Sequence, residues 1–180
     1  MILLLSDGDI SLQRFQPEDV SERYVGWLND PDVMGQTESR NGGHTLESSR
    51  AYVAASLADD RCRLWRIMHE QAGHVGNMRL SDIISFHRRA DTAVIVGERT
   101  LWGANIASRA IRLAAKYAFD ELGMLKLTAG MLATNTASIR AFEKAGYTVE
   151  ARRPLHYRYG DIWVDGVFMG RLSETAFDHA

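Results

Sequence analysis

The spacing of hydrophobic residues changes along the chain, and each change marks an expected element. Residues 9–15, DISLQRF, alternate apolar and polar side chains, as a strand with one buried face does. Other short runs rich in apolar residues end at turn-forming residues, which is typical of strands. These further strands are expected at 61–68, 73–83, 92–98, 125–132, 147–158 and 162–172.

Four segments are predicted to be helical. The first opens at Pro17 with acidic residues in its first turn and stops before Pro31. Thr45 is placed to cap the second helix, and Gly146 is placed to close the last one. The helices are expected at 17–30, 46–59, 103–122 and 135–145, the third with a buried stripe at three- and four-residue steps.

The order of elements is therefore β-α-α-β-β-β-α-β-α-β-β. This order predicts a mixed α/β fold (α+β in some schemes), with a parallel pair of strands in the central β-α-β unit. We expect one domain over residues 1–180, with an ordered core at about 9–172. Ligands of such sheets bind beyond the carboxyl ends of strands, next to helix N-termini.

Composition narrows the classes of partner. Hydrophobic residues make up 46% and charged residues 24%, and the net charge of −2 gives no reason to expect nucleic acid or an anionic membrane. The start, MILLLSDGD, has neither the basic region of a signal peptide nor the length of a membrane span. Cys62 is the single cysteine, which excludes an internal disulfide and fits a cytoplasmic protein. The six histidines lack metal-site spacing, so no metal is expected.

The segment RTLWGANIASRAI, residues 99–111, is the first candidate site. Gly103 stands between an expected strand and an amphipathic helix, where backbone amides lack intrahelical acceptors and the helix dipole favours an anion. Neither the P-loop pattern nor the dinucleotide-binding glycine pattern is present. A single glycine at such a junction is weak evidence, and an ordinary turn is the alternative.

A second segment, NTASIRAFEKAGY, follows downstream at residues 135–147. Together the two segments closely resemble the GCN5-related N-acetyltransferase superfamily, in particular its RimJ/RimL-type branch. The two motifs of that branch are W-G-x-G-x-A and N-x-x-S/A-x-x-x-φ-x-K-x-G-F/Y. The resemblance as a whole covers about residues 9–172, in the same order of elements. The matching residues are Trp102, Gly103 and Ala107 in the first motif, and Asn135, Ser138, Phe142, Lys144, Gly146 and Tyr147 in the second.

The resemblance implies that acetyl-CoA binds as co-substrate. It places the pyrophosphate on backbone amides of the first motif and the pantetheine arm alongside the strand at 92–98, with Asn135 donating to that arm. The implied residues are Ile95, Val96, Gly97, Trp102, Gly103, Ala104, Asn105, Ile106, Ala107 and Asn135.

Three positions depart from the family pattern. Thr100 stands where Gln or Arg is usual, and Asn105 replaces the second glycine of the first motif. Because backbone amides make most of the contacts in this loop, we expect a working site; whether the two changes weaken binding is left open. Arg109 replaces a frequent Glu, and Arg109 or Arg112 is a candidate for the CoA 3′-phosphate.

Acetylation of an amine needs a neutral nucleophile, a polarised thioester carbonyl and a proton for the departing thiolate. The carbonyl is expected to meet a backbone amide near Val96 or Gly97. The tyrosine that supplies the proton in many members of the superfamily is replaced here by Phe142, so Ser138 is the candidate acid; a serine that bonds its own helix backbone is the alternative.

For the base, Glu98 and His156 are the leading candidates, each with a plain structural alternative, and a water relay without a dedicated base is a further one. The candidate acceptor-binding residues are Trp27, Arg40, His87 and Asp165; a packed Trp27 and an Asp165 that caps the last hairpin are the alternatives.

We therefore expect an acetyl-CoA-dependent N-acetyltransferase that transfers the acetyl group directly, as a monomer or homodimer. The acceptor is a small amine such as an amino-sugar nucleotide, or a protein N-terminus. A non-catalytic acetyl-CoA sensor or interaction module is the alternative, favoured by Phe142 and Asn105. An unrelated nucleotide-binding domain is a third hypothesis.

Overall fold

One eight-stranded sheet forms the centre of the computed structural model, which describes residues 5–37 and 42–176. The strand order is β1-β2-β3-β4-β5-β6-β8-β7, and every pair is antiparallel except β5–β6. The strands are β1 Leu5–Asp7, β2 Ile10–Arg14, β3 Arg63–His69, β4 Gly73–Ile84, β5 Arg89–Val96, β6 Lys126–Leu132, β7 Thr148–Tyr159 and β8 Ile162–Leu172.

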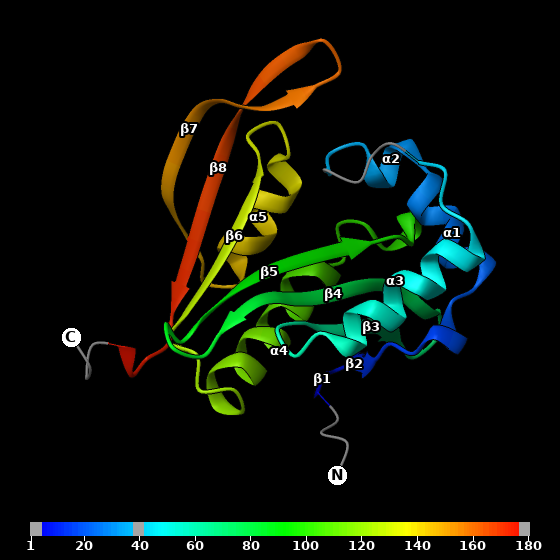
Figure 1. The fold of residues 1–180 in the computed structure, drawn as a ribbon, viewed down its shortest axis with the longest axis horizontal. Coiled ribbons are helices and arrows are strands. Elements are labelled where there is room, and N and C mark those ends of the chain that lie inside the picture. Colours follow the sequence, from blue (N-terminus) through cyan, green and yellow to red (C-terminus); the bar gives the residue numbers. More distant parts are fainter. Residues whose placement is uncertain (1–4, 38–41, 177–180) are drawn as a thin grey trace.

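Helices cover both faces of the sheet (Figure 1). One face packs against α4 in a large core, to which α5 also contributes, and the other packs against α1 and α3 in a second core. The helices are α1 Glu22–Asn29, α2 Pro31–Met34, α3 Leu46–Ala58, α4 Ile106–Asp120 and α5 Thr136–Lys144, with short 3-10 turns η1 Pro17–Asp19 and η2 Arg99–Leu101. In the described part of the chain, no helix is long and apolar enough to cross a membrane.

The predicted mixed sheet with a parallel central pair is confirmed, because β5 and β6 run parallel with α4 as their crossover. The predicted helix from Pro17 divides in two, since the Ser21 side chain accepts from the Tyr24 amide and starts a new helix there. Pro31 does not end the helical region but begins α2. Proline is tolerated in the first turn because the amide that it lacks would have no acceptor within the helix there. The short strand β1 is an element that the sequence pattern does not predict.

Strands β5 and β6 stay together over only three residue pairs, from Arg89–Lys126 to Asp91–Thr128. Beyond them β5 continues beside β4, whereas β6 turns away beside β8. Figure 1 shows the resulting V between the green strand β5 and the yellow strand β6. The second half of β5 therefore has a sheet partner on one side only, and this opening positions the site.

The end of β5 is pressed against α1. A Cβ built on Gly97 would lie 2.0 Å from the Trp27 ring, and the Gly97 amide already donates to the Val75 carbonyl at 2.9 Å. Trp27 itself is 8% exposed and belongs to the α1–α3 core. The glycine is thus needed because the indole approaches the backbone, and Trp27 is placed as a packing residue.

His74 lies in an aromatic cluster within the same core. Its ring stacks on Tyr24 and meets Phe15 and Trp27 edge-on, with centroids 5.1 to 5.9 Å apart. Burial, reinforced by the charges of Arg66 and Arg23, lowers the pKa of His74 to about 4. The folded protein therefore holds this imidazole neutral at pH 7.

Replacing Gly97 by Ala is expected to destabilise the protein by about 2–3 kcal/mol, because the added methyl overpacks against Trp27. Gly26→Ala is the matched control: it lies inside α1, where an added Cβ would meet nothing within 4 Å, and should stabilise by about 0.5–1 kcal/mol. Urea unfolding of both variants checks the pair. Equal effects would show that the contact with Trp27 is not tight.

Stability should fall on acidification through His74. The pKa of His74 is lower in the folded protein than in the unfolded chain. Between about pH 6.5 and about pH 4, the unfolded chain therefore binds a proton at His74 that the folded protein does not. The contribution of His74 to the free energy of unfolding is complete only above this pH range. Between about pH 7.5 and about pH 5, His74 should cost the wild type about 2 kcal/mol that His74→Phe does not lose. Urea unfolding at both pH values measures this difference. His87→Gln, in an exposed turn, should keep the wild-type dependence.

Candidate functional site

The first helical turn of α4 presents free backbone amides to one end of the V. The helix begins at Ile106, later than the predicted Gly103, so the amides of Ile106, Ala107 and Ser108 have no acceptor within the helix. Those of Trp102 and Ala104 are already used, since they donate to the carbonyls of Arg99 and Leu101.

Asn105 explains how the first motif works without its second glycine. Its φ of 62° lies in the left-handed region, which Asn adopts more readily than most residues. The Lys144 ammonium donates to its side-chain oxygen at 2.7 Å and ties the end of α5 to the start of α4. Gly103 has a φ of 85°, and a Cβ there would meet nothing within 4 Å, so the loop surface is open.

Arg109 faces away from this surface. Its guanidinium forms ion pairs with Asp7 and Asp9, at 3.2 and 2.7 Å, and joins α4 to the β1–β2 turn. Because these carboxylates already bind Arg109, Arg112 is the better of the two candidates for the CoA 3′-phosphate. Arg112 is less fully engaged, with a 3.7 Å ion pair to Asp7 and a 3.3 Å bond to the Lys144 carbonyl.

A cavity of about 500 Å³, which we call the α4 cavity, opens over these amides. Its walls come from the outer half of β5, from the segment before and within the first turn of α4, and from α5. The Trp102 indole at its rim donates to the Val96 carbonyl at 2.9 Å. Of the residues expected to bind the co-substrate, the cavity is lined by Ile95, Val96, Trp102, Gly103, Asn105, Ile106, Ala107 and Asn135. Gly97 and Ala104 are not among its described lining residues.

A second cavity of about 400 Å³, the sheet cavity, lies on the opposite side of β5. Strands β4 and β5 form its floor, Tyr24 and Tyr52 lie on its helical side, and Tyr157 reaches it from β7. The two cavities meet, because the same six residues line both of them: Gln36, Thr37, Val94, Ile95, Asn135 and Ser138.

Ser138 stands at that junction. Its amide donates to the Asn135 side-chain oxygen at 3.1 Å, which caps α5 and fixes both residues at the rim. Phe142, one turn further on, is 2% exposed and packs edge-on against Tyr147. The Tyr147 hydroxyl is bound to Thr92 at 2.9 Å, and burial raises its pKa, so this phenol is held away from the chemistry.

Glu98 is occupied by other partners. Its carboxylate is bound by the Arg23 guanidinium and by the Thr100 hydroxyl, and both hold the Glu98 pKa below its usual value. It also caps η2 by accepting from the Thr100 amide. A carboxylate held ionised in this way is a weak base, and it lines neither cavity among the described residues.

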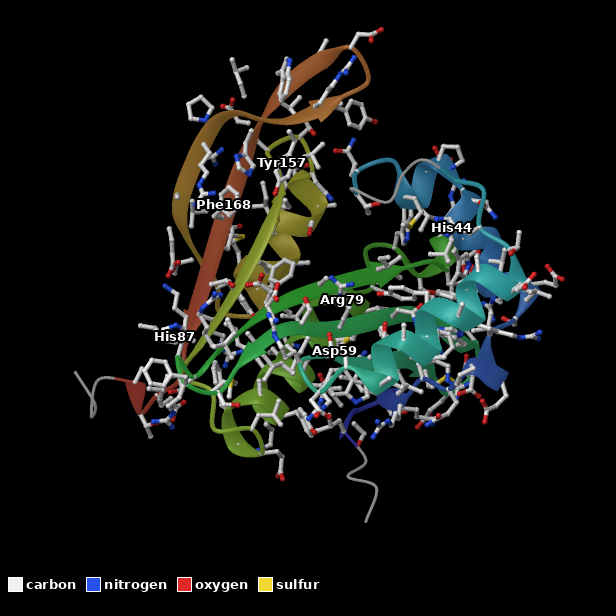
Figure 2. The ribbon with its side chains drawn as sticks, viewed as in Figure 1. His44, Asp59, Arg79, His87, Tyr157 and Phe168 are labelled. Carbon is white, nitrogen blue, oxygen red and sulfur yellow. The ribbon has the colours of Figure 1, made fainter. Side chains whose placement is uncertain are left out.

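Three further candidates lie apart from the junction. His156 is exposed on β7 against Tyr157 and Phe168. Asp165 accepts from the Leu155 amide at 3.0 Å and supports an irregular stretch of β7. Figure 2 shows His87 at the β4–β5 turn, at the far end of the sheet. Arg40 lies outside the described residues.

Polar residues that were not predicted as site residues line the sheet cavity, Asn77 and Arg79 on β4 foremost. The signal that identifies them is the alternation in NMRLS: Met78 and Leu80 are fully buried on the α4 side, so their polar neighbours share the other face. Neither cavity has a His or Glu among its described lining residues, and no metal-binding group of three acidic, His or Cys residues occurs in ranges 5–37 and 42–176.

The chain is similar in sequence to known acetyltransferases. The probable N-acetyltransferase YjcK of Bacillus subtilis is 35% identical over 63 residues, 35% of this chain and 35% of that protein. The spermidine N(1)-acetyltransferase of Escherichia coli is 28% identical over 104 residues, 58% of this chain and 53% of that protein. The matched regions thus span between a third and about half of the length of these curated relatives.

Among solved structures, the spermidine N-acetyltransferase of Vibrio cholerae in complex with CoA and spermine superposes with a TM-score of 0.83. The match is at 17% identity and covers 95% of this chain and 99% of that one, so it supports the fold. A family model described as an acetyltransferase (GNAT) domain matches residues 9–148, well over half of the sequence. The chain therefore belongs to the GNAT acetyltransferase family.

Proposed function

We propose that this protein is an acetyl-CoA-dependent N-acetyltransferase that transfers the acetyl group directly to a primary amine in a ternary complex. The observation that carries the proposal is the meeting of the α4 cavity and the sheet cavity at Ile95 and Ser138. A thioester held at this junction from one side is open to an amine from the other.

The described residues fit the co-substrate. The unpaired amides of Ile106, Ala107 and Ser108 and the positive end of the α4 dipole suit a pyrophosphate. The open edge of β5 suits the amides of a pantetheine arm, which would pair along it as an added strand. Asn135, its oxygen engaged by Ser138, keeps its amide nitrogen to donate to that arm.

Bound acetyl-CoA supplies an activated acetyl group. The amine nitrogen forms the new C–N bond as the C–S bond breaks. The Ser138 hydroxyl donates a proton to the departing sulfur and takes one back from water. With Glu98 held ionised by Arg23 and with no His among the described lining residues, we assign removal of the amine proton to water. The Gly97 amide donates to Val75, so carbonyl polarisation falls to the outer β5 backbone before it.

A covalent acyl-enzyme is not part of this proposal. Cys62 is buried, lies outside the described lining of both cavities, and burial raises the pKa of its thiol. A thiol with a raised pKa is a poor nucleophile at neutral pH.

The class of amine that accepts the acetyl group is inferred from the relatives and the motifs. Two relatives are named for spermidine, and the paired motifs support the RimJ/RimL-type branch, with small amines or protein N-termini as acceptors. A non-catalytic acetyl-CoA sensor is the second candidate function, because Phe142 removes the tyrosine that many superfamily members use as acid. Thioester turnover with an amine separates the two.

Ala107→Glu is expected to abolish acetyl-CoA binding without unfolding the protein. A carboxylate in the first turn of α4 is favoured by the helix dipole but occupies the place assigned to the pyrophosphate. Calorimetric titration should show micromolar binding by the wild type and at least about 100-fold weaker binding by the variant. Ala54→Glu, on the exposed side of α3, is the control. No binding by the folded wild type would exclude the proposed function.

Ser138→Ala should lower kcat by about 10–100-fold with little change in the KM for acetyl-CoA, since it removes a proton donor used only in the transfer step. The Asn135 cap accepts from the residue 138 amide, which alanine retains. Steady-state thiol release measures both constants. An unchanged kcat would assign the thiolate proton to solvent or to Tyr157.

A further inference from the structure

The floor of the sheet cavity carries two polar side chains in one row. Asn77 and Arg79 alternate with Met78 and Leu80 along β4, so both point to the same face. Asn77 pairs in register with Ile95, at the junction of the two cavities, and Arg79 pairs with Ala93 one step further inward. Figure 2 shows Arg79 near the middle of the sheet, between β5 and α3.

The Arg79 guanidinium is only partly satisfied by the protein. Nη1 donates to the Tyr52 hydroxyl at 2.9 Å. Nε is buried and has no acceptor, and no carboxylate of the described residues forms an ion pair with Arg79. Arg79 is half-buried, and Asp82 is close enough to favour its charge without forming an ion pair with it. A guanidinium that lines a cavity in this way matches the oxygens of a carboxylate or phosphate.

The acidic residues of the same cavity are engaged elsewhere. Asp82 is bound by Arg61, and Asp91 accepts from the Thr128 hydroxyl. Asp82 is therefore already paired with a cation and Asp91 with a hydroxyl, whereas Arg79 forms no ion pair with a carboxylate of the described residues.

Asn77 offers a hydrogen-bond acceptor, whereas Arg79 offers donors. It is 7% exposed, its amide nitrogen donates to the Trp65 carbonyl at 3.4 Å, and its side-chain oxygen has no hydrogen-bond partner among the described residues. An oxygen left in this way accepts an N–H, which is what an attacking amine offers at the junction.

We propose that Arg79 determines acceptor specificity by binding an anionic group of the acceptor, while Asn77 accepts a hydrogen bond from its reacting amine. The acceptor class is then a primary amine that carries a carboxylate or a phosphate. This inference rests on the proposed function and selects among its acceptors. A polyamine fits the site poorly, because its second cation would be desolvated against Arg79.

The test is calorimetric binding to the CoA-loaded protein with matched probes. Glucosamine 6-phosphate is compared with glucosamine for the phosphate, and L-phenylalanine with L-phenylalaninamide for the carboxylate. In at least one pair, the anionic member should bind at least about 10-fold more tightly to the wild type, and Arg79→Gln should remove that preference while leaving the uncharged partner unchanged. Arg79→Lys should recover part of it, since the charge is kept and the planar fork is lost.

Arg14→Gln, an exposed site on β2, loses the same charge away from the cavity and should keep the preference. Circular dichroism establishes that each variant is folded, and the Lys variant serves if the Gln variant is not. No preference in either pair, a preference that survives Arg79→Gln, or tighter binding of spermidine than of both anionic probes overturns the inference. Acetyl-CoA binding by the same samples keeps this outcome separate from failure of the proposed function.

Discussion

The separation of β5 from β6 is the constraint on which the site depends. Only three residue pairs join the two strands, and each strand is then held by its outer neighbour, β5 by β4 and β6 by β8. The opening is therefore maintained from outside rather than by contacts across it. The inner edge of β5 is left with backbone groups that need partners, and an extended ligand arm can supply them.

The helix ends around this opening are held in place by charged side chains. Lys144 binds Asn105 from the side of α5, and Arg109 binds Asp7 and Asp9 from the side of the β1–β2 turn. The first turn of α4 is thus clamped on two sides before any ligand arrives. Amides fixed in advance lose little entropy when they bind an anion, which compensates in part for the missing second glycine.

Hydrophobic periodicity and helix caps predicted most of the fold. The site could be predicted only where its backbone geometry requires particular residues, such as Gly103 in the first motif. Asn135 caps the start of α5, and Gly146 follows its end with a positive φ. Both residues can be recognised from the local sequence alone. Two candidate site residues take part in tertiary contacts that the sequence does not show. Glu98 stands at the end of the right strand, but Arg23, 75 residues earlier in the chain, occupies it. Asp165 supports the β7–β8 hairpin, and only the register of that hairpin shows this.

The polar face of β4 joins stability to function. Its other face places Val75, Met78 and Leu80 fully inside the large core, so the strand is anchored regardless of what lies opposite. That anchoring lets Asn77 and Arg79 keep unsatisfied polar atoms at a cost that would unfold a weaker strand. Ligand groups that meet these atoms recover the cost on binding, and groups that cannot meet them leave it in place. Under the proposed acceptor class, discrimination between acceptors would follow from whether a ligand group meets these two polar side chains.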